Sequence, residues 1–404
     1  MRIALIAPVW FPVPPERYGG TERVVSLLAD GLVEAGHDVT LFASGDSQTE
    51  AALDSVFETA PSERIGQTWW ELQHAVHALG RAGEFDVVND HTGLLGLALG
   101  GLVTVPFVHT VHGPLDGGPG EMYAEICRLV PRARLISISR SQRAPRPRLP
   151  WVATCHNALD LSLYPFRPGD RAARRRDYLV FLGRMSPDKG AHRAIAIARK
   201  ADVPLKIAAK CRERAEQEYF EQFVRPHLGG GVEYVGEVGH GDKVELLSGA
   251  RALLFPIAWE EPFGLVMVEA MACGTPVIAT RRGSVPEVVE HGRSGIVVDD
   301  YRDMPAALEQ ADRLDPAQIR AVAEERFSPE RMVADYLAAY GAVVAEHEVL
   351  GAAETAARTA RTATETAEAA ARAAAAATLA AEAATRSAEQ ASRAVDGGDA
   401  VTTR

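Results

Sequence analysis

Two carboxylates stand in a stretch that otherwise has the composition of protein core, EEPFGLVMVEAMACGTPVIA at residues 260–279. Apolar side chains surround Glu269, and Glu261 comes eight positions earlier, before a Pro-Phe-Gly turn. A buried carboxylate is costly unless it is hydrogen-bonded, so a ligand rich in hydroxyl groups would suit both acids. We expect Glu261 to bind a neutral polyhydroxyl group and Glu269 a vicinal diol, such as that of a ribose. The alternatives are a helix-start acid at Glu261 and a structural ion pair at Glu269.

The residues between these acids predict a helix whose first turn faces the same ligand. ALLFPI has the pattern of a strand, Pro262 can occupy the first turn of a helix, and GLVMVEAMACG is helical. A helix that begins at Phe263, Gly264 and Leu265 offers unpaired backbone N–H groups and a positive dipole end, which suit a diphosphate. Gly264 leaves room for the close approach of a ligand.

Two cations follow another predicted strand, in FLGRMSPDKG. Gly183 ends this strand, and Arg184 and Lys189 lie on the loop after it. They could neutralise the same phosphates without a metal ion. The alternative is that they are two ordinary surface cations, which is the commoner situation for a single Arg or Lys.

The N-terminal part carries a second glycine-containing turn, FPVPPERYGGTERVV. Gly19 and Gly20 precede Thr21, which is a plausible N-cap. The turn lacks the G-x-G-x-x-G spacing of nicotinamide-binding proteins, which disfavours a dehydrogenase. Further on, VHTVHGP places His109 and His112 at a strand end, where a histidine is about as often packed or exposed as it is a ligand.

Short β-rich runs alternate with helical patterns in two blocks, which predicts βαβ units on parallel sheets. The strands expected in the first block are RIALIAPV, DVTLFAS, FDVVNDH, PFVHTVHG, RLISIS and WVATCHNA, and those in the second are DYLVFLGRM, LKIAAK, VEYVGEV, ALLFPI, PVIAT and GIVVD. The expected fold class is therefore α/β, with two tandem Rossmann-like, doubly wound domains. Ligands of such sheets bind beyond the carboxyl ends of the strands, so we expect a substrate cleft between the domains.

Composition narrows the class of protein. The 404 residues favour two or three domains, and the net charge of -11 disfavours general nucleic-acid binding. The four cysteines have neither metal-ligand nor disulfide spacing, and the N-terminus has the pattern of a first strand rather than a secretory signal. No segment approaches the roughly 20 apolar residues of a membrane span. We therefore expect a cytoplasmic protein with reduced thiols.

The segment EPFGLVMVEAMACGTPVIA, with its two glutamates separated by seven residues, resembles the signature of the family 4 retaining glycosyltransferases, which have the GT-B fold. The resemblance runs from RIALIAPV to about Ala345. It implies that Glu261 holds the donor sugar and Glu269 the ribose, while Arg184 and Lys189 hold the diphosphate.

The resemblance also implies the remaining site residues. Gly20 would lie over the phosphate, and His112 matches the cleft histidine better than His109 does. The implied donor-binding residues are Gly20, Gly183, Arg184, Lys189, Glu261, Pro262, Phe263, Gly264, Leu265 and Glu269. The implied catalytic residues are His112, Arg184, Lys189 and Glu261. The acceptor side would include Gly19, Gly20, His109, His112 and Asn157. No metal or other cofactor is implied, and a UDP-, GDP- or ADP-sugar would be the donor substrate.

This chain departs from the family pattern at three small residues. Ala158 follows Asn157 where many relatives have glycine, Ala209 stands where a glycine facing the nucleotide is common, and Ser284 replaces a frequent second glycine. Because each replacement is small, we expect the pocket to be kept. The identity of the donor is what these changes leave open.

We expect an acceptor-side domain at residues 1–165, a donor domain at 177–330, and a helix at 331–350 that packs back towards the N-terminal domain. The Arg-rich segment between the domains, 164–177, has the composition of a solvated linker, with a binding patch as the alternative. The expected activity is transfer of a sugar from a nucleotide-diphosphate donor to an acceptor hydroxyl with retention. The alternatives are an epimerase or phosphorylase on the same scaffold, and a non-enzymatic scaffold that acts through its C-terminal helix.

Residues 351–404 form a tail of Ala, Thr, Glu and Arg in which charges recur with alternating gaps of three and four residues. This spacing predicts a helix with i,i+4 ion pairs but no apolar seam. We expect a solvated single helix, with weak self-association through its alanine face as the alternative.

A group of arginines lies in the presumed acceptor domain without an acid between its members: Arg128, Arg132, Arg134, Arg140, Arg143, Arg146 and Arg148. A solvated rim is the simpler interpretation, since surface charge usually contributes little. The alternatives are an anionic acceptor or transient contact with an anionic membrane.

Overall fold

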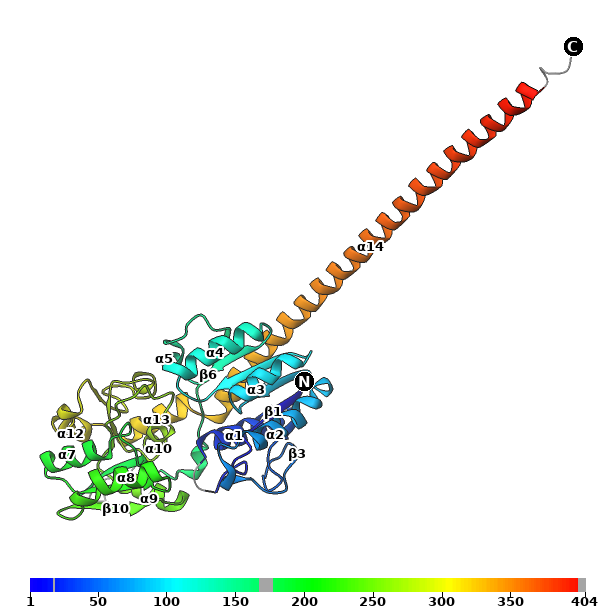
Figure 1. Ribbon diagram of the computed structural model, residues 1–404. Coiled ribbons are helices and arrows are strands. Elements are labelled where there is room, and N and C mark those ends of the chain that lie inside the picture. Colours follow the sequence, from blue (N-terminus) through cyan, green and yellow to red (C-terminus); the bar gives the residue numbers. More distant parts are fainter. Residues whose placement is uncertain (17–18, 167–176, 399–404) are drawn as a thin grey trace, which may run out of the picture. The chain divides into compact units, whose positions relative to one another are not determined.

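The computed structural model describes residues 1–16, 19–166 and 177–398. They belong to two units, Met1–Val344 and Ala345–Arg404. Most of the predicted linker at 164–177 lies outside the described residues. In the colours of Figure 1, the N-terminal sheet and its helices run from blue to cyan and the second sheet and its helices from green to yellow.

Within the described N-terminal part of the first unit, parallel strands form a sheet in the order β3-β2-β1-β4-β5-β6-β7. The strands are β1 (Arg2–Ile6), β2 (Asp38–Phe42), β3 (Ala52–Asp54), β4 (Val87–Asp90), β5 (Phe107–Val111), β6 (Arg134–Ser137) and β7 (Trp151–Thr154). The α-helices of this part are α1 (Gly20–Glu34), α2 (Thr68–Gly80), α3 (Leu94–Leu99), α4 (Gly117–Leu129) and α5 (Arg140–Arg143). The strand order reverses between β1 and β4, which creates a crevice at their carboxyl ends.

The second sheet has the order β10-β9-β8-β11-β12-β13 and is also parallel. Its strands are β8 (Leu179–Arg184), β9 (Leu205–Lys210), β10 (Val232–Gly236), β11 (Leu253–Phe255), β12 (Val277–Thr280) and β13 (Gly295–Val298). Its α-helices are α7 (Ala191–Ala201), α8 (Arg214–Phe223), α9 (His240–Gly249), α10 (Leu265–Ala272), α11 (Val285–Val288), α12 (Met304–Asp312) and α13 (Pro316–Arg326). Here the order reverses between β8 and β11.

Short 3₁₀ helices complete the described connections: η1 (Ser62–Arg64), η2 (Ala82–Glu84), η3 (Gly100–Leu102), η4 (Leu161–Leu163), η5 (Arg225–His227) and η6 (Tyr301–Asp303). The predicted α/β class with two doubly wound domains is confirmed, and the strand expected from each β-rich run is present. An additional strand, β3, was not predicted; it is a three-residue edge strand whose side chains are largely exposed.

The central strands are continuous apolar runs because helices cover both faces of each sheet. All of β4, β5 and β12 is buried, and so are the polar side chains that β4 and β5 carry, Asn89, Asp90, His109 and Thr110. Buried polar groups must be hydrogen-bonded to be tolerated. Polar residues in the middle of a buried sheet therefore mark a place where a specific network forms.

The last helix, α14 (Pro329–Gly398), begins inside the first unit. Met332, Tyr336 and Tyr340 belong to the core of the N-terminal sheet, together with residues of β1 and α1. The helix approaches α1 closely because Gly31 has no side chain: a Cβ there would lie 2.6 Å from Val333 Cγ2. Burial of two full tyrosines favours this position strongly.

The second unit contains the remainder of α14, so the predicted C-terminal helix is confirmed. From Gly351 onward every side chain that the structure describes is exposed. Several threonines, among them Thr355 and Thr359, donate to the carbonyl four residues earlier, and Arg372 pairs with Glu368 at 3.7 Å. Among the described helices, none combines the length and the apolar character needed to cross a membrane.

Candidate functional site

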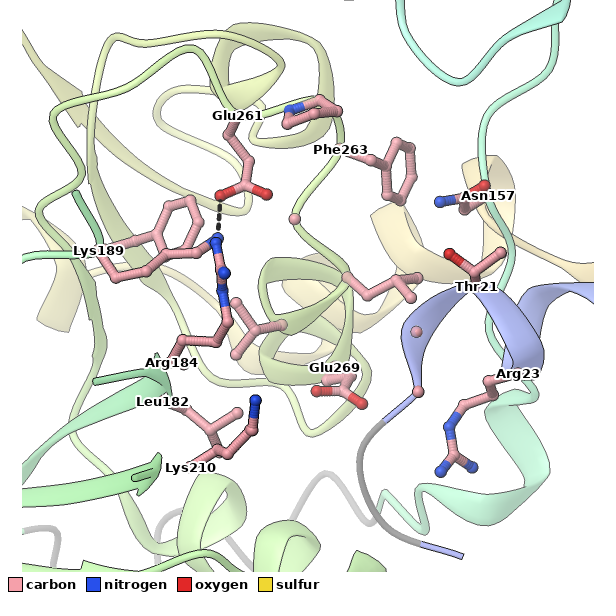
Figure 2. A pocket seen from close by; sticks show the side chains of 18 of the residues that line it. Thr21, Arg23, Asn157, Leu182, Arg184, Lys189, Lys210, Glu261, Phe263 and Glu269 are labelled. Atoms are coloured by element: carbon pink, nitrogen blue, oxygen red, sulfur yellow. Dashed lines mark hydrogen bonds and ion pairs between the residues drawn. The ribbon is translucent and has the colours of Figure 1, made fainter. Parts of the chain in front are cut away.

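A pocket of about 400 Å³ lies where the carboxyl ends of strands from both sheets meet, and Figure 2 shows side chains that line it. The predicted site residues that line it are Gly19, Gly20, His112, Asn157, Gly183, Arg184, Lys189, Glu261, Pro262, Phe263, Gly264, Leu265 and Glu269. The exception is His109, which is buried in the N-terminal sheet. Its Nδ1 lies 2.6 Å from Asp90 Oδ2, and its Nε2 lies 3.2 Å from the Tyr123 hydroxyl.

The start of α10 lies at the pocket wall. The helix begins at Leu265, and its N-cap, Gly264, has a left-handed φ of 77°. A Cβ at Gly264 would lie 2.8 Å from Met267 Cε, so glycine is required both for the conformation and for the space. The prediction that Pro262 occupies the first turn is wrong, because the chain bends before Gly264 and leaves Pro262 outside the helix. The first N–H groups, on Leu265 and Val266, have no intrahelical acceptor.

A neighbouring turn fixes the loop that carries Glu261. Gly283 has a φ of 51°, and a Cβ there would lie 2.3 Å from Glu261 N and O. The next residue, Ser284, is fully buried; its N–H donates to Glu261 O (2.9 Å) and its hydroxyl to Phe263 O (2.7 Å). The serine that departs from the family pattern therefore holds the acidic loop in place.

Glu261 is bound on one side only. Its Oε2 accepts hydrogen bonds from Lys189 Nζ and from Trp259 Nε1 (3.0 Å), and Lys189 Nζ lies 4.6 Å from the centroid of the Trp259 ring. Within the described part of the chain, Oε1 has no hydrogen-bond partner. Figure 2 shows a single contact between the carboxylate and Lys189. One oxygen therefore remains for a ligand that donates a hydrogen bond.

Glu269 has the same arrangement deeper in the pocket. Its Oε1 accepts from Lys243 Nζ and from the Tyr164 hydroxyl (2.9 Å), whereas Oε2 has no partner among the described residues. Burial by itself would raise the pKa of Glu269, but Lys243 and Tyr164 hold that pKa below its usual value, so the group is ionised. The structural ion pair that was the alternative for Glu269 is therefore present, with Lys243 as the partner. A ligand can bind one oxygen of Glu269 rather than both.

Cations line the C-terminal side of the pocket. Arg184 ends β8, and its contact with Asp188 is long, 3.8 Å, so its guanidinium is available to an anion. Lys210 ends β9 and pairs with Glu213 and Glu216. Of these two strands, β8 borders the point where the sheet order reverses and β9 is its neighbour, and ligands bind near such a point.

The N-terminal side is made of the start of a helix, which also carries Arg23, and of neutral histidines. Here α1 begins at Gly20 and its N-cap is Gly19, so the prediction of an N-cap at Thr21 is wrong. His112 follows β5, and its Nε2 lies 2.9 Å from Nδ1 of His91, which follows β4. Burial lowers the pKa of His112 to about 3, with a contribution from His109, so the ring is uncharged at neutral pH.

Several pocket residues were not found by sequence reasoning. Among them are Thr21, Arg23, Lys210, Lys243 and Trp259. Lys210 ends one correctly predicted strand and Trp259 follows another, so position at a strand end was a usable signal for them. Lys243 lies in the first turn of α9, where only the folded chain brings it to Glu269.

Comparison with known proteins agrees with this architecture. The family model of the glycosyl transferases group 1 matches residues 167–315, and that of Glycosyltransferase Family 4 matches residues 18–143. The D-inositol 3-phosphate glycosyltransferase of Pseudarthrobacter chlorophenolicus is 28% identical over 397 residues, covering 81% of this chain and 91% of that protein. The glycogen synthase of Mycobacterium tuberculosis is 29% identical over 393 residues, covering 83% and 91%.

Among solved structures, AviGT4, a glycosyltransferase involved in avilamycin A biosynthesis, superposes with a TM-score of 0.63 and 27% sequence identity, covering 85% of this chain and 98% of that one. Two Rossmann-like domains around one pocket, together with these matches, define a glycosyltransferase with the GT-B fold. Within that class, the chain belongs to the family 4 glycosyltransferases. The predicted transferase is thus confirmed, and none of these matches favours the epimerase, phosphorylase or scaffold alternatives.

Proposed function

We propose that the protein transfers a sugar from a nucleotide-diphosphate sugar to an acceptor hydroxyl, with retention of the anomeric configuration. The observation that carries this proposal is the pair of half-bound carboxylates, Glu261 and Glu269, with the start of α10 between them (Figure 2). A nucleotide sugar presents hydroxyl groups at both ends and negative charge in the middle, which is complementary to this arrangement. Glu261 would bind the sugar and Glu269 one ribose hydroxyl.

The diphosphate would lie against Arg184, Lys189 and the first N–H groups of α10. These groups would stabilise the charge that develops on the leaving diphosphate. Lys189 is held in the pocket by Glu261, so a diphosphate would share this cation rather than find it free. Residues 177–330 would form the donor domain, in which the ends of β8, β9 and β11 meet.

Retention follows if the acceptor attacks on the face from which the diphosphate leaves. The bond between the anomeric carbon and the phosphate oxygen breaks, the bond to the acceptor oxygen forms, and the acceptor proton passes to the departing phosphate oxygen. This step needs no separate general base from the protein. The chain's own residues hold the donor, neutralise the leaving group and, on domain closure, exclude water.

The N-terminal domain, residues 1–165, would supply the acceptor side through Gly19, Gly20, His112 and Asn157. The Asn157 side-chain oxygen is buried and has no hydrogen-bond partner among the described residues. The names of the relatives mentioned above refer to different molecules, an inositol phosphate and glycogen. Family membership therefore leaves the acceptor of this chain open.

We also propose that exposed arginines of this domain, among them Arg128 and Arg148, face an anionic membrane surface. Arg128 and Arg148 are exposed, and so, at 80% each, are the apolar side chains of Leu102 and Leu129. The chain neighbours of these leucines, Gly101 and Val130, pack closely, since a Cβ on Gly101 would lie 2.9 Å from Val130 Cγ2.

Arg143 differs from the exposed arginines, because it stacks on Trp151 and donates to Thr154, which indicates a structural role. Co-sedimentation of Leu102→Ser/Leu129→Ser and Arg128→Ser/Arg148→Ser variants with anionic and neutral vesicles tests this surface; equal sedimentation with both vesicle types would contradict it.

A cytoplasmic location remains part of the proposal. The four cysteines are free thiols, and burial raises the pKa of Cys155 to about 12 and that of Cys273 to about 11. Thiols of this kind are inert and suit a reducing compartment.

A donor screen tests the proposed function. UDP-, GDP- and ADP-sugars are ranked by thermal shift of the full chain, and the best donor is then offered to a panel of acceptors in the presence of EDTA. We expect one nucleotide class to stabilise the protein, slow hydrolysis without acceptor, and a product whose anomeric proton coupling matches that of the donor. An inverted product would contradict retention, and turnover that depends on an added divalent cation would contradict the proposed neutralisation of the diphosphate.

A further inference from the structure

A buried hydrogen-bond network runs from the pocket to the first part of α14. His112 Nε2 contacts His91 Nδ1 at 2.9 Å, and His91 Nε2 contacts Asn89 Oδ1 at 2.8 Å. The Tyr340 hydroxyl reaches the same Asn89 oxygen at 2.6 Å. His91, Asn89 and Tyr340 are almost completely buried, so water cannot substitute for any of these contacts.

The direction of each hydrogen bond is fixed from one end. Asn89 Nδ2 lies 3.3 Å from Val108 O and 3.1 Å from Thr110 Oγ1. A backbone carbonyl only accepts, so the amide nitrogen must face Val108 and the amide oxygen must face His91 and Tyr340. The pairing of Asn89 with Val108 in the register of β4 and β5 makes this contact part of the sheet itself.

The orientation of the Asn89 amide then determines which nitrogen of each histidine donates and which accepts. Because Asn89 Oδ1 only accepts, His91 carries its proton on Nε2, which leaves a lone pair on Nδ1. That lone pair requires His112 to donate from Nε2, so the remaining nitrogen of His112, Nδ1, is an acceptor. Among the described residues Nδ1 of His112 has no partner, and His112 lines the pocket. A charged state of either ring is disfavoured, since burial lowers the pKa of both histidines.

We propose that His91, Asn89 and Tyr340 are positioning residues that make His112 a hydrogen-bond acceptor, so that the substrate group it holds must be a donor, a hydroxyl. The assignment of that substrate group rests on the proposed function, whereas the polarity of the network does not. Tyr340 thereby makes the first part of α14 a contributor to the site without touching the ligand.

The direct test is a long-range ¹H–¹⁵N spectrum of the full chain labelled with ¹⁵N-histidine, recorded near neutral pH. Such a spectrum separates the Nε2–H tautomer, the Nδ1–H tautomer and the cation, and His91→Gln and His112→Gln variants assign the two rings. We expect both rings as neutral Nε2–H tautomers. An Nδ1–H tautomer or a cation at either ring would overturn the proposal, and this result does not depend on any activity.

Matched variants test the consequence for turnover. His91→Leu removes the acceptor for His112 and should lower kcat/KM about tenfold, a typical effect of losing one buried hydrogen bond. His91→Asn keeps an acceptor oxygen near the position of Nδ1 and should recover most of that loss. Equal activity in the two variants would contradict a role in polarity. If the Leu variant does not fold, the spectrum of the wild-type protein still decides.

Tyr340→Phe has its own control on the same helix. Tyr336 is equally buried, but its hydroxyl is 3.5 Å from Thr110 Oγ1 and does not reach Asn89. Tyr340→Phe should lower kcat/KM roughly three- to tenfold, and Tyr336→Phe should leave it unchanged. Equal losses would assign Tyr340 to packing alone. If no nucleotide sugar is turned over, the proposed function fails, while the tautomer spectrum still confirms or overturns the network.

Discussion

The two sides of the pocket differ in the kind of interaction that they offer a ligand. The C-terminal side is built from charged groups that satisfy one another only in part, Lys189 with Glu261 and Lys243 with Glu269. Apart from Arg23, the N-terminal side is uncharged where it approaches the ligand, with His112 and His91 neutral and joined to Asn89. The charged side is suited to stabilise a change in charge during reaction, and the neutral side to orient a substrate.

This difference explains the partners that each side needs. A buried carboxylate loses more on being left unpaired than a neutral group does, so each glutamate has a lysine. A neutral ring needs only hydrogen bonds of the correct direction, which the sheet supplies through Val108 and Asn89. Removing a charge should therefore affect turnover strongly, and acid should damage the neutral side first.

The largest effect is expected for Arg184→Ala. Loss of one charge-assisted contact to the diphosphate should cost roughly 1.5–3 kcal/mol in kcat/KM, more in the transition state than in substrate binding. The control is Arg214→Ala, which removes an exposed arginine of the same domain whose one ion-pair partner among the described residues is Glu218. Steady-state kinetics with the best donor measure both. Near-wild-type turnover in Arg184→Ala would place the diphosphate elsewhere.

The two sides should also differ in their response to pH. The pKa values of His91 and His112 lie below 6.5 in the folded protein, so the unfolded chain binds more protons as the pH falls. Their stability contribution is complete above pH 6.5 and declines below it, by about 1.4 kcal/mol per histidine at a pH one unit lower. The pKa of Glu269 is lowered from 4.5, so its contribution is lost only in more acidic solution.

Urea unfolding at a series of pH values measures this. The free energy of unfolding should fall less steeply in His112→Gln between neutral pH and about pH 5.5, because the contribution of one histidine is removed. An unchanged slope in that variant would mean that His112 is not neutral in the folded protein.

The smallest effect is expected for the tail, since the residues that line the pocket include none of its described residues. Its described side chains are exposed from Gly351 onward, so truncation after this residue should leave kcat/KM and the unfolding midpoint of the first unit nearly unchanged. Helical circular dichroism should fall. Light scattering of the full and truncated chains provides the check, because a change in oligomeric state would favour self-association through the alanine face.

Much of this architecture could be predicted from the sequence because its signals are local. Apolar runs predicted the strands of both sheets, and the segment from Glu261 to Glu269 carried its own motif. The exception was β3, because a short edge strand with exposed side chains has no apolar run. Pro262 was misplaced because Gly264, rather than the proline, sets where α10 begins.

The partners of the site residues could not be predicted, since they come from distant parts of the chain. Tyr164 and Lys243 reach Glu269 across 105 and 26 positions, and Tyr340 reaches Asn89 across 251. One signal was available: FDVVNDH places polar residues at the end of a strand in the middle of a buried sheet. Such residues need a network, and Asn89 and His91 form it.

Comparing Glu269→Gln with Glu261→Gln tests whether one free oxygen of each glutamate binds a different part of the donor. Because Glu269→Gln also leaves Lys243 unpaired, Glu269→Gln/Lys243→Met is measured beside it. With the best donor, Glu269→Gln should mainly raise KM, since ribose contacts persist from the ground state to the transition state, and Glu261→Gln should mainly lower kcat. Reversed phenotypes, or a Glu269 variant that loses only stability with donor KM unchanged, would contradict the account.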